Sequence, residues 1–221
     1  LPPLLESLGC EVFELYCEPN GDFVRGTEPL PEHLKNLGEE VIKYGADVGF
    51  AVDPDADRLA IVNEMGEPLG EEYTLVVAAD GYLRDTGKEE KFVINLSTSL
   101  ALEKLAESNN SSVTRSAVGE INVVNKMIEI NSKLGGEGNG GVIHRECHLG
   151  RDSMVAATMV LNRMSISESL ISEIHASLPQ FEIVKDKIDI EGIDIEDAIG
   201  RVSLLFKGAA IDKIDGIKFT W

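Results

Sequence analysis

Residues 53–58 read Asp53-Pro54-Asp55-Ala56-Asp57-Arg58 and stand between two apolar stretches, Val48 to Val52 and Leu59 to Val62. The two stretches are typical of strands, and the loop between them carries carboxylates at alternate positions. Three such carboxylates repel one another unless a cation lies between them. Carboxylate oxygens favour magnesium, calcium or manganese over zinc. The segment therefore predicts a metal loop with Asp53, Asp55 and Asp57 as ligands.

Arg58 follows the third aspartate directly, where it can offset the carboxylate charge or bind a phosphate brought to the metal. The same spacing fits a calcium loop with Glu64 at its twelfth position, but such a loop needs glycine in place of Arg58 and helices as flanks. A phosphatase with an aspartyl nucleophile would use Asp53 and Asp55, although Asp57 replaces the small or β-branched residue expected there. A solvated acidic turn is the fourth interpretation.

Composition excludes several classes of partner. The chain has 221 residues, of which 43% are hydrophobic and 27% charged, and its net charge is −19. This charge argues against nucleic acid and against anionic membrane surfaces, and no apolar run approaches the roughly 20 residues that a membrane span needs. The expected partner is a small molecule. Three cysteines without metal-type pairing predict a reducing, cytoplasmic compartment.

Helix and strand patterns alternate along the chain and predict an α/β architecture. Helices are expected at 2–8, 31–44, 71–83, 100–106, 119–128, 153–164, 167–178 and 198–206. Strands are expected at 10–15, 48–52, 59–62, 91–96, 112–116, 142–143 and 181–184, followed by a linker at 185–197 and a hairpin at 211–221. Ser97 or Thr98 is expected to cap the fourth helix and Asp152 the sixth.

A second candidate site lies in the run Gly135-Gly136-Glu137-Gly138-Asn139-Gly140-Gly141. Its glycines allow positive φ and close backbone approach, while Glu137 and Asn139 offer an acceptor and a mixed donor-acceptor. This pair suits sugar hydroxyls. A flexible glycine connector is the alternative interpretation.

Two further motifs stand at expected junctions into helices. The first runs from Arg115 to Glu120, where a strand end presents free backbone N–H groups to a ligand. The second is His148-Leu149-Gly150-Arg151-Asp152. His144 lies four residues before His148, but a zinc site there would lack a third ligand of the usual kind, so a hydrogen-bonding role for His148 is favoured.

In this order the four motifs resemble those of the alpha-D-phosphohexomutase superfamily, which includes phosphoglucomutase, phosphomannomutase and phosphoglucosamine mutase. The run Asp53 to Arg58 is similar to the magnesium loop of the family, and Gly136 to Gly141 to its sugar-recognition loop. The run Arg115 to Glu120 resembles the segment that closes over the substrate, and Gly150 to Asp152 the motif that opens the next helix.

The resemblance implies tandem phosphoglucomutase-like α/β domains, each a mixed sheet layered with helices. Residues 1–67 would be the C-terminal part of domain 2, residues 68–184 domain 3, and residues 185–221 a linker with the start of domain 4. The phosphoserine loop of domain 1 and the phosphate clamp of domain 4 are not found in the sequence. The fragment is therefore expected to be inactive by itself and to need these domains as partners.

For the complete protein the resemblance implies phosphoryl transfer from a phosphoserine to a hexose phosphate, through a hexose bisphosphate that turns over in the cleft. Mg²⁺ would lie on the three aspartates of the metal loop, assisted by the catalytic residue Arg58. Glu137 and Asn139 would hold sugar hydroxyls. The other substrate-binding residues would be Gly119, Glu120 and Arg115.

Two positions depart from the pattern of some relatives. Gly141 stands where these relatives end the sugar loop in His, and Ser97 stands where they place Lys. The general base is therefore open between His148 and Glu120, and the choice among glucose, mannose and glucosamine phosphates is open too. A non-catalytic acidic module that binds a metal or a sugar phosphate is the alternative function.

Overall fold

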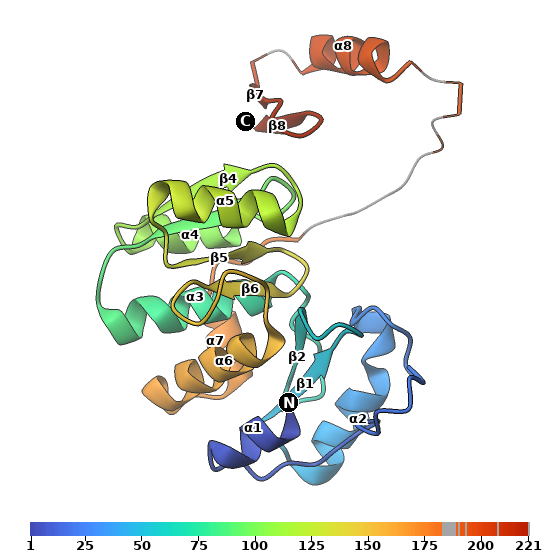
Figure 1. Cartoon of the computed structure of the whole chain (residues 1–221), viewed down its shortest axis with the longest axis vertical. Coiled ribbons are helices and arrows are strands. Elements are labelled where there is room, and N and C mark those ends of the chain that lie inside the picture. Colours follow the sequence, from blue (N-terminus) through green and yellow to red (C-terminus); the bar gives the residue numbers. More distant parts are fainter. Residues whose placement is uncertain (183–188, 190, 193, 207, 221) are drawn as a thin grey trace.

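The computed structural model describes residues 1–182, 189, 191–192, 194–206 and 208–220. Within these residues the strands form three sheets, which occur in chain order (Figure 1). The first has strands β1 and β2, the second has strands β3 to β6, and the third has strands β7 and β8. The second sheet is mixed and carries helices on both faces, so the predicted α/β class is confirmed.

The part of the chain around the first sheet contains the expected metal loop. Its elements are α1 (Pro2–Ser7), the 3₁₀ turn η1 (Pro31–His33), α2 (Lys35–Tyr44), β1 (Val48–Val52) and β2 (Leu59–Asn63). The strands are antiparallel, and Val52 lies opposite Leu59. Helix α2 ends at Gly45, which adopts the left-handed conformation at φ 65°. A small core of Leu34, Val41, Ala51, Ala60 and Val62 joins α2 to the strands.

The second sheet is the core of the molecule. Its elements are α3 (Tyr73–Thr86), β3 (Lys91–Asn95), α4 (Ala101–Ser108), β4 (Ser112–Ser116), α5 (Glu120–Ile130), β5 (Leu134–Glu137), β6 (Gly141–His144), α6 (Ser153–Ser167) and α7 (Ile171–Ser177). Strand β3 lies between β4 and β5 and is parallel to both, while β6 pairs with β5 in the antiparallel direction. The carboxyl ends of β3, β4 and β5 therefore share one edge of the sheet.

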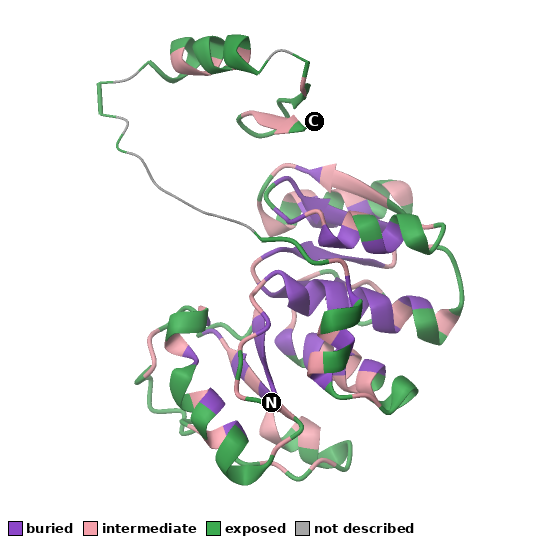
Figure 2. Cartoon of the chain, turned by 180° about the vertical axis from the view of Figure 1, so that it is seen from behind, coloured by how far each residue is buried: buried purple, intermediate pink, exposed green. Residues whose placement is uncertain are grey.

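Helices cover both faces of this sheet. Val93 and Ile143 pack with α5 on one face, whereas Phe92 and Ile94 pack with α3, α4 and α6 on the other. Buried residues concentrate in α3 and in strands β3, β5 and β6, whereas most of β4 is only half-buried (Figure 2). Side chains alternate between the faces of a strand, so each central strand contributes to both cores.

The last described elements are α8 (Ile195–Leu205), β7 (Ala210–Asp212) and β8 (Lys218–Thr220). The hairpin of β7 and β8 contacts the carboxyl edge of the second sheet. There the backbone N–H of Val118 donates to Asp215 Oδ2 at 2.8 Å, and Lys218 Nζ donates to the carbonyl of Leu96 at 3.4 Å. Helix α8 has no buried residue.

Three expectations about the sequence before residue 145 are wrong. Residues 10–15 form no strand, because no other described strand pairs with them. Gly135 and Gly136 belong to β5 rather than to a loop, since they pair with Val93 and Ile94 of β3. The side chains of Ser97 and Thr98 do not cap α4; both donate to Asn95 Oδ1 instead.

The helices and strands after residue 145 differ from the expected ones mainly in their bounds. Helix α6 continues to Ser167, and α7 begins only at Ile171. Residues 181–182 form no strand, and the remainder of that expected strand lies outside the described residues, as does much of the expected linker. Asp152 caps α6 as predicted, accepting bonds from the backbone N–H groups of Met154 and Val155.

Candidate active site

The metal loop is a tight turn between β1 and β2. Oxygens of Asp53, Asp55 and Asp57 all lie within 4.8 Å of one another. Asp53 is buried and accepts bonds from the backbone N–H groups of Asp57 and Arg58 at 3.1 and 3.0 Å, whereas Asp55 is exposed. Ala56 turns the chain with a φ of 58°. Hydrogen bonds to Asp53 therefore stabilise a turn on which the three carboxylates lie close together.

The electrostatics of this loop fit a cation. Burial raises the pKa of Asp57 to about 6, and the neighbouring Asp53 adds to the shift. Burial would also raise the pKa of Asp53, but hydrogen bonds from Arg58 outweigh it and the pKa is lowered. Asp57 Oδ1 is buried and accepts no hydrogen bond from the described residues, although Arg58 Nε lies 3.7 Å away as an ion-pair partner. A hard divalent cation would bind this oxygen and would offset the repulsion among the three carboxylates.

Arg58 is held by acids on two sides. Its Nε donates to Asp53 Oδ2 at 2.5 Å, and its Nη1 donates to Glu28 Oε2 at 2.6 Å. The hydrogen bond from Arg58 lowers the pKa of Glu28. Glu28, in the segment before η1, thus contacts the metal loop through Arg58. The sequence pattern did not indicate this contact.

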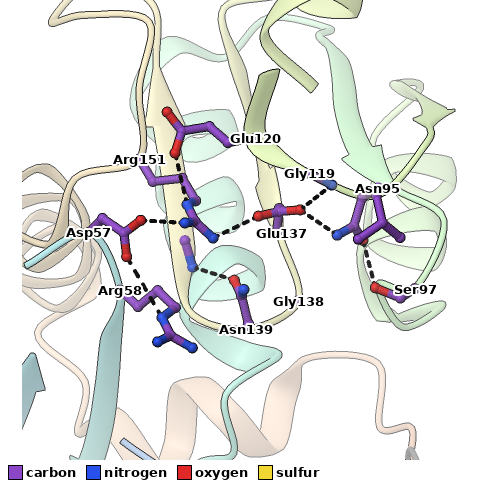
Figure 3. A network of polar contacts seen from close by, with 12 residues as sticks. Asp57, Arg58, Asn95, Ser97, Gly119, Glu120, Glu137, Gly138, Asn139 and Arg151 are labelled. Atoms are coloured by element: carbon purple, nitrogen blue, oxygen red, sulfur yellow. Dashed lines mark hydrogen bonds and ion pairs between the residues drawn. The ribbon is translucent and has the colours of Figure 1, made fainter. Parts of the chain in front are cut away.

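Glu137 lies at the end of β5, on the edge where β3 and β4 also end. Its side chain is buried, and its Oε1 accepts bonds from Asn95 Nδ2 at 2.7 Å and from the N–H of Gly119 at 3.1 Å (Figure 3). The N–H of Gly138 donates to Thr98 Oγ1 at 3.0 Å. Asn95 at the end of β3 and Thr98 shortly after it therefore hold the predicted sugar-recognition loop, Gly136 to Gly141, which is called the sugar loop below.

Arg151 joins the metal loop to the sugar loop (Figure 3). Its Nη2 pairs with Asp57 Oδ2, its Nη1 donates to Glu137 Oε2 at 2.7 Å, and its Nε donates to Glu120 Oε2 at 3.1 Å. Backbone contacts also connect the two parts, because the N–H of Leu59 donates to the carbonyl of Gly140 at 3.0 Å. The two candidate loops thus form one site.

The remaining predicted residues lie around this centre. Asn139 is half-buried in the turn between β5 and β6, and its Oδ1 accepts a bond from the N–H of Gly141 at 3.3 Å. Gly119 is the N-cap residue of α5. His148 is exposed, and its Nε2 lies 3.0 Å from Asp152 Oδ2.

The side chain of Arg115 bonds mainly to backbone carbonyls at the end of β3 and in the loop that follows it. Its Nη1 donates to the carbonyls of Asn95, Leu96 and Thr98 at 2.8 to 3.0 Å, and its Nε donates to Glu103 Oε1 at 2.8 Å. It thereby holds the loop after β3, which in turn supports Glu137.

Sequence reasoning missed Asn95, Thr98 and Glu28, and it gave Arg151 no contact. The available signal was a polar residue at the end of a buried strand, which applies to Asn95. A second buried carboxylate, Glu72, supports the same loops, since it accepts the N–H of Ser99 at 2.9 Å. An added Cβ on Gly138 would lie 2.0 Å from Glu72 Oε2, so only glycine fits over this carboxylate.

Replacing Asp152 with alanine is expected to destabilise the chain by about 1 kcal/mol at neutral pH, because α6 loses its N-cap. Burial would raise the pKa of Asp152, but hydrogen bonds from His148 and from the backbone lower it below the ordinary value of 3.8. A lowered carboxyl pKa stabilises the fold above that value and ceases to do so as the pH falls through the folded-state pKa.

The difference between the wild type and Asp152→Ala should therefore shrink below about pH 3.8. Urea unfolding across pH 2.5 to 7 measures it. Asp152→Asn is the matched control, because it keeps the capping oxygen but cannot ionise. A constant difference at all pH values would contradict the role of the Asp152 charge.

Comparisons with known proteins found family models and relatives that match this chain. The family model described as phosphoglucomutase/phosphomannomutase, alpha/beta/alpha domain II, matches residues 1–66, and the model of domain III matches residues 70–181. A phosphoglucomutase/phosphomannomutase from Thermococcus kodakarensis is 37% identical over 99% of this chain and 48% of its own length. A probable phosphoglucosamine mutase from Methanopyrus kandleri is 30% identical over 98% of this chain and 48% of its own length.

A solved structure shows the same fold. A phosphoglucomutase/phosphomannomutase family protein from Burkholderia thailandensis matches with a TM-score of 0.84 at 22% identity, over 100% of this chain and 48% of that one. The α/β fold of this chain is thus shared with that protein. The chain belongs to the phosphoglucomutase/phosphomannomutase family, as the resemblance of its motifs predicted.

The chain spans about half the length of the curated relatives it matches. Among the helices of the described residues, none has both the length and the apolar character needed to cross a bilayer.

Proposed function

We propose that this chain is part of a phosphohexomutase, an intramolecular phosphotransferase that interconverts hexose 1-phosphate and hexose 6-phosphate. The observation that carries the proposal is the bridge of Arg151 from Asp57 to Glu137, because it brings a cation-binding loop and a sugar-type loop to one centre. The names of the relatives support the same reaction. They include phosphoglucomutase, phosphomannomutase and phosphoglucosamine mutase, so glucose, mannose and glucosamine phosphates are the candidate substrates.

Asp53, Asp55 and Asp57 would hold Mg²⁺, which when bound neutralises charge on the phosphoryl oxygens. Arg58 lies beside these carboxylates and is the catalytic cation that this chain itself supplies. Its guanidinium is oriented by Asp53 and Glu28, so it is positioned before the substrate arrives.

Glu137 and Asn139 would hold sugar hydroxyls. Three donors from the protein occupy the carboxylate of Glu137, which has about four acceptor positions. One position is left for a hydroxyl, and the three protein bonds fix where it points. Gly119 and Glu120 would also bind the substrate. Arg115 would contribute to substrate binding indirectly, by holding the loop after β3.

His148 and Glu120 are the candidate acid and base groups. His148 Nε2 is paired with Asp152, an arrangement that fixes which ring nitrogen carries the proton. Glu120 pairs with Arg151 through its Oε2.

The complete protein would add the phosphoserine of domain 1 and the phosphate clamp of domain 4, and it would pass through a hexose bisphosphate. We place it in the cytoplasm as a phosphoprotein. We also propose domain limits at residues 67 and 184, the second of which lies outside the described residues.

Calorimetric titration of the chain with Mg²⁺, Ca²⁺ and glucose 1,6-bisphosphate tests the proposal against a non-catalytic acidic module. We expect weak Mg²⁺ binding, because the phosphoserine ligand is on another domain, and tighter binding when the bisphosphate is present. Asp55→Ala should remove the Mg²⁺ response. Tight Ca²⁺ binding without any response to the bisphosphate would favour the alternative function.

A further inference from the structure

The side chain of Arg151 reaches its three carboxylates by passing over Gly141. A Cβ placed on Gly141 would lie 2.3 Å from Arg151 Cδ and 3.1 Å from Arg151 Cγ. Contacts this short force a neighbour to move. Arg151 cannot move freely, because each nitrogen of its guanidinium that faces the site is bound to a carboxylate. Glycine at position 141 is therefore needed for the path of Arg151.

The three carboxylates come from three separate segments. Asp57 belongs to the metal loop, Glu137 to the end of β5, and Glu120 to the first turn of α5. A guanidinium is a rigid planar group with N–H donors in fixed directions, so it fixes its partners relative to one another. Arg151 is shielded as well, with 17% of its side chain exposed, which strengthens these bonds.

We propose that Arg151 is a positioning residue that couples the metal loop to the sugar loop, and that Gly141 is the glycine that makes room for it. The roles of the two loops rest on the proposed function, but the coupling does not require catalysis. A change at Asp57 reaches Glu137 through Arg151, and it reaches the N–H of Gly119 through Glu137 Oε1 (Figure 3).

A double-mutant cycle tests the path of Arg151 in the chain itself. We expect Gly141→Ala to lower the folding equilibrium constant about tenfold or more in the wild type, and by no more than about twofold when Arg151→Ala is also present. Gly200→Ala is the control, since a Cβ there meets nothing within 4 Å. If Gly141→Ala does not fold, recovery of folding in the double variant supports the proposal. An equal loss in both backgrounds overturns it.

A Mg²⁺ titration followed by backbone amide NMR tests the coupling. The N–H of Asp57 reports on the metal loop, and the N–H of Gly119 reports on Glu137. The chemical shifts of both amides should change on addition of Mg²⁺ in the wild type and in the control Arg145→Ala. The side chain of Arg145 bonds only to Asn131 among the contacts described. In Arg151→Ala the shift at Asp57 should remain and the shift at Gly119 should fall at least about fivefold.

An unchanged shift of Gly119 in Arg151→Ala overturns the coupling while leaving the metal site intact. Absence of any shift at Asp57 in the wild type contradicts the proposed metal site instead. In that case the result of the double-mutant cycle decides the positioning role.

Discussion

In the complete protein, replacing Asp55 with alanine is expected to lower the proposed phosphoryl transfer between sugar positions by about a thousandfold or more and to leave the fold intact. Removing a single preorganised group that stabilises transition-state charge costs about 10² to 10³ in rate, and loss of a metal ligand also weakens the cation itself. The fold is preserved because Asp55 is exposed on the turn. A coupled assay of hexose 6-phosphate formation measures the rate, and circular dichroism measures the fold.

Asp47→Ala is the matched control for this experiment. Asp47 is another exposed aspartate, but it precedes β1, at the opposite end of that strand from the metal loop. It should leave turnover unchanged. Near-normal turnover in Asp55→Ala would remove the proposed metal role.

Replacing Asp80 with alanine destabilises the chain by about 3 to 5 kcal/mol, the largest effect on stability that we expect. Asp80 on α3 pairs with Arg163 on α6, and both side chains are 4% exposed. Without Asp80 the guanidinium of Arg163 stays buried with only the hydroxyl of Ser167, 2.6 Å from its Nη1, as a described side-chain partner. The two helices pack closely here, since a Cβ on Gly81 would lie 2.9 Å from Arg163 Cβ.

Urea unfolding measures this loss, and Glu107→Ala is its control. Glu107 pairs with Lys104 at 2.8 Å on the exposed surface of α4, where an ion pair contributes about 0 to 1 kcal/mol. Equal losses in the two variants would show that the pair between α3 and α6 is not the buried contact described above.

Local patterns predicted the elements that depend on neighbours in the sequence. The metal loop lies between strands with nearly the expected bounds, because apolar runs and a turn of aspartates are local signals. Gly45 ends α2 and Asp152 begins α6, since capping is also local. The expected strand at 10–15 failed because alternation describes a half-buried face but cannot supply a strand to pair with.

Contacts between distant residues were beyond such reasoning. Asp57 and Arg151 are 94 positions apart, and nothing in either motif shows that they pair. Arg115 and Arg151 both stand near candidate motifs, but one binds backbone carbonyls and the other binds three carboxylates. The run of glycines predicts a loop, since the tight packing of these residues is visible only in the fold, where a Cβ on Gly135 would lie 2.6 Å from Met127 Sδ.

Phosphorus NMR of the complete protein with glucose 1-phosphate, mannose 1-phosphate or glucosamine 1-phosphate tests the proposed reaction itself. We predict conversion of at least one of them to its 6-phosphate in the presence of Mg²⁺, and loss of the conversion when the metal is chelated. Absence of phosphoryl migration for all three sugars, with Mg²⁺ bound and the fold intact, would contradict the assignment of a mutase.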